Sequence, residues 1–110
     1  MSHDHHHQPS HDAPIVRDMS ALTGEQKRRY RLLARKLAAA VAETRELDRG
    51  YALKLAEQRL SLPEAGEWML LEGKCCPFLE IAMESQSGAL VITLAGREGV
   101  KAFLKRELAI

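Results

Sequence analysis

The chain has 110 residues, the length of one domain, and its 16 basic residues nearly balance 15 acidic ones. The formal net charge of +1 gives no indication of a polyanionic partner. The longest uninterrupted apolar run, residues 37–42, is far shorter than the roughly 18 residues that indicate a membrane span. The start of the chain has no apolar segment of the secretory type, so we expect a cytoplasmic protein without a membrane partner.

The five histidines all fall within the first eleven residues. Residues 1–14 have almost nothing apolar to bury, so we expect a disordered His-rich tail ahead of a single α+β domain over residues 15–110. The tail is either a weak metal-binding arm or an unselected extension. Its candidate metal ligands are His3, His5, His6, His7 and His11.

The first part of the domain predicts a short edge strand and a long helix. Residues 15–19 begin with two β-branched side chains, which favour the strand. Thr23 and Gln26 have the spacing of a capping box, and apolar residues then recur at three- and four-residue steps until Gly50 stops the run. We therefore expect a helix over residues 24–47.

Strands and helices alternate in the rest of the chain. Alternating apolar residues predict a strand over residues 51–56. A second capping box at Ser61 begins a helix that runs to Cys75, where it must stop because Pro77 pushes the residue before it out of the helical conformation. The remaining expected elements are a strand over residues 79–84, a turn over 85–88, a strand over 89–95 and a helix over 100–108.

The resulting order, (β)αβαββα, predicts a two-layer α+β sandwich. Each of the three helices offers one apolar stripe, and a hairpin with one or two more strands makes a small sheet. We therefore expect a mainly antiparallel sheet of three or four strands with the helices on one face.

Residues 72–78 carry the pattern that points to chemistry, Glu-Gly-Lys-Cys-Cys-Pro-Phe. On a helix, Glu72 lies three residues before Cys75 and four before Cys76, so its carboxylate is on the same side as the thiols. Adjacent side chains of a regular helix point about 100° apart, which would separate the two thiols. Pro77 removes this obstacle, because it forces Cys76 out of the helix and frees its thiol to swing toward the first. The pattern predicts a joint thiol site at a helix–strand junction.

The donor set of this site favours a soft ion. Thiolates select zinc, cuprous copper and heavier thiophilic ions. Zinc usually takes four ligands, with cysteines two to four residues apart, whereas mercuric ion or arsenite needs fewer contacts and matches better. We expect Cys75 and Cys76 as ligands and Glu72 as a weak third ligand or a supporting residue. Lys74 would offset the accumulated negative charge.

Two other interpretations of the cysteine pair remain open. Free cysteine packs well as a small hydrophobic residue, so Cys75 and Cys76 could belong to the core of a structural or regulatory interaction domain. A redox enzyme is less favoured, because adjacent cysteines lack the spacing of thioredoxin-like motifs. The folded part also contains no histidine to activate a catalytic thiol. The pattern therefore favours a protein that is not an enzyme.

The interaction-domain alternative would use a basic run in the first helix to contact protein or nucleic acid. A nucleic-acid partner is not favoured, because the overall charge is near zero and no nucleic-acid-binding motif is present. A protein partner or a second copy of the chain remains a candidate. The basic residues are Lys27, Arg28, Arg29, Arg31, Arg35 and Lys36.

Several segments occur here in a characteristic combination. They are Ser-Ala-Leu-Thr at 20–23, Gly-Tyr at 50–51, Glu-Trp at 67–68, Cys-Cys-Pro-Phe-Leu at 75–79, Ala-Gly-Arg-Glu-Gly-Val-Lys at 95–101 and Phe-Leu at 103–104. With them, residues 15–110 resemble small uncharacterised bacterial proteins with a CCPF signature, found alone or associated with MerR-type metal-responsive regulators. The resemblance supports the same fold and favours metal chemistry. It also implies a further cysteine in the first short strand of many members, at the position of Arg17, where this chain has none.

Together these patterns predict a non-catalytic, thiol-based binding module for a soft metal or metalloid ion. The candidate ions are mercuric, cuprous, arsenite and zinc, and the candidate ligands are Cys75, Cys76 and Glu72.

Overall fold

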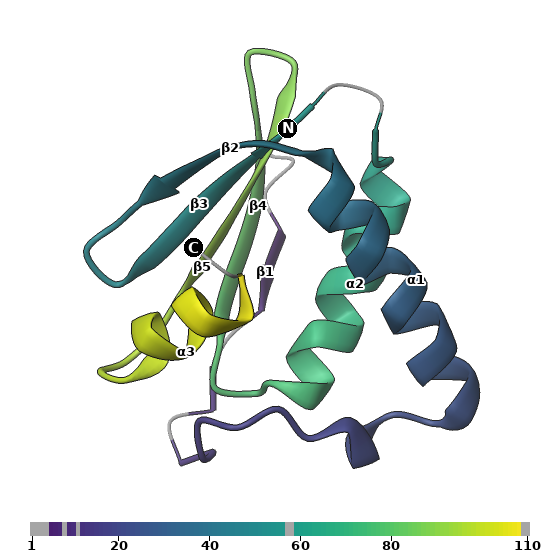
Figure 1. Ribbon diagram of the computed structural model, residues 1–110, viewed down its shortest axis with the longest axis vertical. Helices are drawn as coiled ribbons and strands as arrows, with labels where there is room; N and C mark the ends of the chain where they lie inside the picture. The colour runs from purple at the N-terminus through teal and green to yellow at the C-terminus, as the bar shows by residue number, and fades with distance from the viewer. Residues whose placement is uncertain (1–4, 8, 11, 57–58, 109–110) are drawn as a thin grey trace.

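The computed structural model describes residues 5–7, 9–10, 12–56 and 59–108. Within these residues, three α-helices pack on one face of a five-stranded sheet (Figure 1). This confirms the predicted α+β class. The elements are β1 (His5–His7), the 3-10 helix η1 (Met19–Ala21), α1 (Gly24–Ala40), β2 (Val41–Glu46), β3 (Gly50–Leu55), α2 (Leu62–Cys75), β4 (Glu80–Gln86), β5 (Ala89–Ala95) and α3 (Val100–Glu107).

The sheet is built from two hairpins that meet at their inner strands. Its order is β1-β4-β5-β3-β2, and every neighbouring pair is antiparallel. The register aligns apolar residues of β4, β5 and β3 across the sheet, so that their side chains point to the same face. These residues are Ile81, Leu94 and Tyr51 in one row and Met83, Ile92 and Leu53 in the next. All six are buried in the core beneath the helices.

Local signals explain where α1 and α2 begin. The backbone N–H of Gln26 donates to Thr23 Oγ1 over 3.1 Å, and the N–H of Thr23 donates to Gln26 Oε1 over 2.9 Å. Ser61 and Glu64 exchange the same two bonds at the start of α2, over 3.2 and 3.1 Å. Both predicted capping boxes are confirmed, and such a cap is worth about 1 kcal/mol.

Glycine is required where the two hairpins meet. Gly50 pairs with Ala95 across β3 and β5, and a Cβ added to Gly50 would overlap the carbonyl oxygen of Leu94. The second hairpin turns at Ser87 and Gly88, which both have positive φ, as a two-residue turn between twisted strands demands.

The predicted helix over residues 24–47 is confirmed over residues 24–40 and wrong over residues 41–47. The helix α1 ends at Ala40, and the chain continues directly into β2, an edge strand that pairs with β3. The backbone N–H of Ala56 donates to the Ala40 carbonyl over 2.7 Å, which ties the end of α1 to the end of β3. Most of β2 is exposed, so strand pairing rather than burial of an apolar stripe decides its conformation.

The edge strand predicted over residues 15–19 is also wrong, because residues 15–18 form a loop that leads into η1. Strand β1 comes instead from His5–His7, which pair with β4. The expectation of a disordered tail is therefore wrong for these three residues, while residues 1–4, 8 and 11 lie outside the described part. With β1 and β2 added, the sheet has five strands rather than three or four.

Residues 12–22, which we call the N-terminal strap, cross the C-terminal end of α2. Figure 1 shows this segment, in dark purple, passing below α2 before it enters α1. The backbone N–H of Asp18 donates to the carbonyl of Cys75 over 2.8 Å. The strap thus satisfies a carbonyl that the end of a helix leaves without an intrahelical partner, and it fixes its own side chains beside the two cysteines.

Candidate thiol site

The end of α2 brings the three predicted site residues together. Cys75 is the last helical residue, and Cys76 caps the helix with φ −132° and ψ 66° while its N–H donates to the Glu72 carbonyl over 2.8 Å. A carboxylate oxygen of Glu72 and the two sulfurs all lie within 4.8 Å of one another. The predicted effect of Pro77 is confirmed, since the chain leaves the helix at Cys76 and both thiols reach one point.

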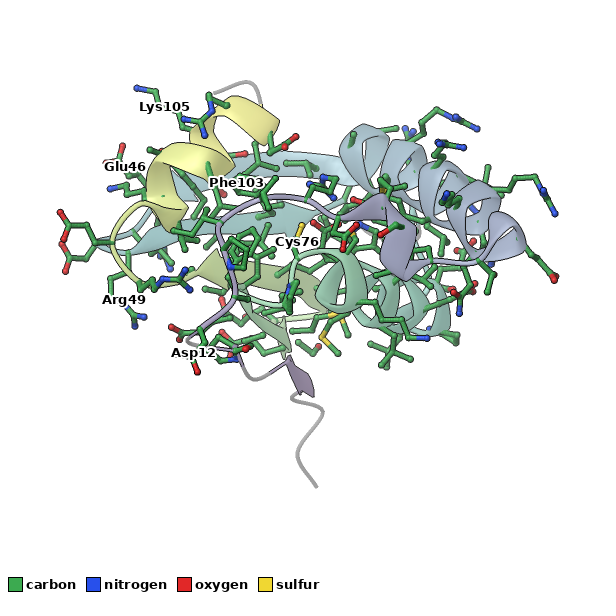
Figure 2. All side chains as sticks on the ribbon, turned by 90° about the horizontal axis from the view of Figure 1, so that it is seen from below. Asp12, Glu46, Arg49, Cys76, Phe103 and Lys105 are labelled. Carbon is green, nitrogen blue, oxygen red and sulfur yellow. The ribbon has the colours of Figure 1, made fainter. Side chains whose placement is uncertain are left out.

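The site is buried. Both cysteines have an exposed fraction of 0%, and Glu72 has 4%. Figure 2 shows Cys76 toward the middle of the molecule, with charged residues such as Glu46 and Lys105 at the rim. A buried carboxylate is stable only with hydrogen-bonding or charged partners. The partners of Glu72 therefore define the chemistry of the site.

Glu72 has two such partners, Arg17 and Tyr30. Arg17 Nη1 lies 3.0 Å from Oε1 and 3.2 Å from Oε2, and the hydroxyl of Tyr30 donates to Oε2 over 2.5 Å. Arg17 also donates to the Tyr30 hydroxyl oxygen. Its Cζ lies 5.6 Å from the centre of the Tyr30 ring and 5.9 Å from that of Phe103. The guanidinium is thus fixed against the carboxylate from several sides.

The same guanidinium reaches the first thiol. Arg17 Nη1 lies 3.7 Å from Cys75 Sγ, within hydrogen-bonding range for sulfur. Lys74, which we expected to balance the negative charge, is exposed and lines a groove between α1 and α2 instead. The positive charge beside the sulfurs therefore comes from the N-terminal strap and not from the residue next to the pair.

The two thiols differ in acidity. A hydrogen bond from Cys76 lowers the pKa of Cys75, against the opposing effects of burial and of the Glu72 charge, and Arg17 lowers it further. The same hydrogen bond raises the pKa of Cys76, and burial and Glu72 raise it more. The pair therefore loses its first proton from Cys75 and holds the second on Cys76.

Tyr30 stays a neutral hydrogen-bond donor in this setting. Burial raises the pKa of its hydroxyl, and so do the negative charge of Glu72 and the hydrogen bond to it. The site then contains one buried negative charge on Glu72, one positive charge on Arg17 and a neutral phenol that joins them.

A cleft of about 380 Å³ borders the site. Arg17, Tyr30 and Glu72 line its polar end, whereas its other walls are mostly apolar side chains of α1, the sheet and α3. Its volume is in the range of small-molecule pockets, roughly 300–1,000 Å³. Apolar wall residues include Leu37, Val41, Leu53, Trp68, Leu94 and Leu104.

Sequence reasoning missed the roles of Arg17 and Tyr30. Tyr30 is visible in the sequence only as a member of the apolar stripe of α1, although a buried phenol hydroxyl generally needs a polar partner. Arg17 stands at the place where the resemblance implies a third cysteine, and this position does face the thiols. Of the predicted histidine ligands, His5, His6 and His7 form β1, while His3 and His11 lie outside the described residues.

A comparison of the chain with known protein families, curated proteins and solved structures finds no match. Within the described residues, no helix is long and apolar enough to cross a membrane. The function must therefore be argued from the geometry of the site.

Proposed function

We propose that the protein is a non-catalytic binding module for a soft metal or metalloid ion, with Cys75 and Cys76 as thiolate ligands. The observation that carries the proposal is the placement of two sulfurs and a carboxylate within 4.8 Å of one another in the core. Two sulfurs on one side of a small site are a donor set for thiophilic ions. We place this function in the cytoplasm, because a reducing compartment keeps such thiols free.

The contacts of Glu72 limit the kind of ion. Its two oxygens already accept hydrogen bonds from Arg17 and Tyr30, so coordination through Glu72 would break a buried ion pair. Glu72 is therefore better suited to hold Arg17 in place than to bind the ion itself. This leaves two sulfurs, which suits ions of low coordination number and does not satisfy the four ligands of a zinc site.

The cleft offers a route to the buried sulfurs. The Arg17 side chain separates the polar end of the cleft from Cys75, and 23% of it is exposed. Its outer contact is an ion pair with Glu107 over 3.8 Å, and the Glu107 side chain is 42% exposed. A swing of the Arg17 side chain toward solvent would open Cys75 to a small ion, at the cost of the weak, exposed pair with Glu107 and of the buried contact with Glu72.

A structural interaction domain is the second candidate function, and the complete burial of both sulfurs favours it. Its contact surface would be the groove between α1 and α2, where Leu32 and Leu70 are exposed. Part of the basic run is already neutralised there, since Arg29 pairs with Glu67 across this groove. Lys36 likewise pairs with Glu64. These pairs weaken the case for nucleic acid more than that for a protein partner.

Ion binding to the cysteine variants tests the proposal. Titration of the reduced protein with arsenite, cuprous and mercuric ions should give one site in the native chain, whereas zinc ion should bind more weakly. In Cys75→Ser and Cys76→Ser the affinity should fall more than the roughly 10- to 100-fold typical of a supporting residue. Lys74→Gln is the matched control, because it neighbours the pair but is exposed, and it should bind as the native chain does.

Two outcomes would contradict the proposal. Equal affinity in the native chain and both cysteine variants would exclude the pair as the ligand. Loss of binding on deletion of residues 1–14, with no loss in the cysteine variants, would assign the ion to the histidine tail.

A further inference from the structure

Arg17 occupies the position beside the sulfurs where a third ligand would stand. Its Nη1 atom is 3.7 Å from Cys75 Sγ and 3.0 Å from Glu72 Oε1. A guanidinium is always protonated and carries only donors, so it has no lone pair to give to a metal ion. Whatever binds to the two sulfurs therefore meets a hydrogen-bond donor with a positive charge at its third position.

A cationic ion gains little binding free energy from a positively charged donor beside the sulfurs. A soft dication held by two thiolates still carries partial positive charge, and it completes its shell with a Lewis base. Here the carboxylate oxygens of Glu72 are engaged by Arg17 and Tyr30, the Glu72 carbonyl already accepts from the Cys76 N–H, and the charged group in contact with Cys75 is positive.

An uncharged hydroxide of a trivalent metalloid is better suited to two thiols with a guanidinium beside them. Arsenite is neutral at neutral pH, and arsenic(III) binds its three ligands in a pyramid that leaves two sulfurs on one side. As(OH)₃ reacts with two thiols to give a bis-thiolate that keeps one hydroxyl, and two water molecules leave. Both new arsenic–sulfur bonds replace arsenic–oxygen bonds, each thiol proton departs with a hydroxide, and no oxidation or reduction occurs. The retained hydroxyl oxygen is an acceptor for a cationic donor.

We infer that the thiol pair takes a neutral hydroxylated metalloid of the arsenite type in preference to soft dications, and that Arg17 determines this preference by donating to the retained hydroxyl. This inference rests on the proposed function of the cysteine pair. Glu72 and Tyr30 act as positioning residues, because they hold the guanidinium in its place beside Cys75.

A matched pair of variants isolates the charge of Arg17. Arg17→Gln alone leaves Glu72 buried without its cation, so this variant could simply fail to fold. Glu72→Gln keeps the guanidinium, with the glutamine amide oxygen and the Tyr30 hydroxyl as its acceptors, and Arg17→Gln combined with Glu72→Gln differs from it only at Arg17. Affinities for sodium arsenite and for cadmium chloride are measured on the full reduced chain and on both variants. Circular dichroism checks that each variant is folded.

The arsenite affinity should fall about 10- to 100-fold between Glu72→Gln and the double variant, the range typical of a residue that supports a ligand. The cadmium affinity should stay the same or rise, because a positive charge is removed and an amide oxygen is added. X-ray absorption of the arsenite complex of the native chain should show two sulfurs and one oxygen around arsenic.

The possible failures are distinguishable. If arsenite, cadmium, mercuric and cuprous ions all fail to bind to the native chain, the proposed function is wrong; if mercuric or cuprous ion binds through the cysteines and arsenite does not, only the preference for arsenite is wrong. If both bind through Cys75 and Cys76 but the ratio of their affinities is the same in Glu72→Gln and the double variant, only the role of Arg17 is wrong. An arsenic shell of three sulfurs would also overturn it, because no hydroxyl would remain for Arg17 to contact.

Discussion

Arg17 donates to both carboxylate oxygens of Glu72, a residue 55 positions later in the chain. This contact joins the N-terminal strap to the last turn of α2 and places a guanidinium beside Cys75. The buried negative charge of Glu72 thus has a fixed counter-charge, and the thiol pair has a cationic neighbour that is not adjacent to it in sequence.

Removal of one member of this ion pair should destabilise the fold strongly. Arg17→Met leaves the Glu72 charge buried without its cation, and we expect a loss of about 3 kcal/mol in the free energy of unfolding. The value is at the low end for a buried pair because 23% of the Arg17 side chain is exposed. Urea denaturation measures it. Arg17→Met combined with Glu72→Met should recover most of the loss, and a double variant as unstable as the single one would contradict this account.

Tyr30→Phe should cost about 1.5–3 kcal/mol, the range for a hydrogen bond to a charged group, because it removes the donor to Glu72 and keeps the ring. The effect should depend on pH. The pKa of Tyr30 is raised above its ordinary value of 10.0 by burial and by Glu72, so its contribution is complete below pH 10 and is lost as the pH rises further. Between pH 8 and a pH above 10, the free energy of unfolding should fall less for Tyr30→Phe than for the native chain. An equal fall in both proteins would be inconsistent with this site.

Glu64→Gln should reduce stability at neutral pH but not in strong acid. The hydrogen bond from Lys36, followed by those from Ser61, lowers the pKa of Glu64 to about 2, so its stabilising effect is present above its unfolded pKa of 4.5 and is lost as the pH falls toward 2. Glutamine keeps an acceptor for the N–H of Ser61, which preserves the capping box and isolates the charge. Thermal unfolding from pH 7 to pH 2 checks this. A difference between the two proteins that persists at pH 2 would argue against it.

Cys75 should react with thiol reagents before Cys76. The hydrogen bond from Cys76 lowers the pKa of Cys75, and Cys75 lies next to the Arg17 side chain that borders the cleft. In the folded protein, a small methanethiosulfonate reagent should therefore label Cys75 in the Cys76→Ser variant faster than it labels Cys76 in the Cys75→Ser variant. Mass spectrometry follows the labelling. A bulky reagent should label both only after denaturation, because both sulfurs are fully buried. If even the small reagent requires denaturant, the ion-binding proposal fails.

The sequence by itself determined the features that arise from neighbouring residues. The capping boxes at Thr23 and Ser61 and the end of α2 before Pro77 depend on side chains that contact a backbone only a few positions away. For the same reason the sequence predicted that Glu72, Cys75 and Cys76 come together, since they lie within one turn of helix and its cap.

Only the tertiary structure decided the remaining features. Residues 41–46 continue the apolar pattern of α1, yet pairing with β3 makes them a strand. The placement of Arg17 and Tyr30 at the thiols depends on how the N-terminal strap and α1 pack against α2, across 55 and 42 positions of chain. A buried carboxylate must find a partner, but local spacing cannot say which of the 16 basic residues supplies it, because the choice is made by packing between distant segments.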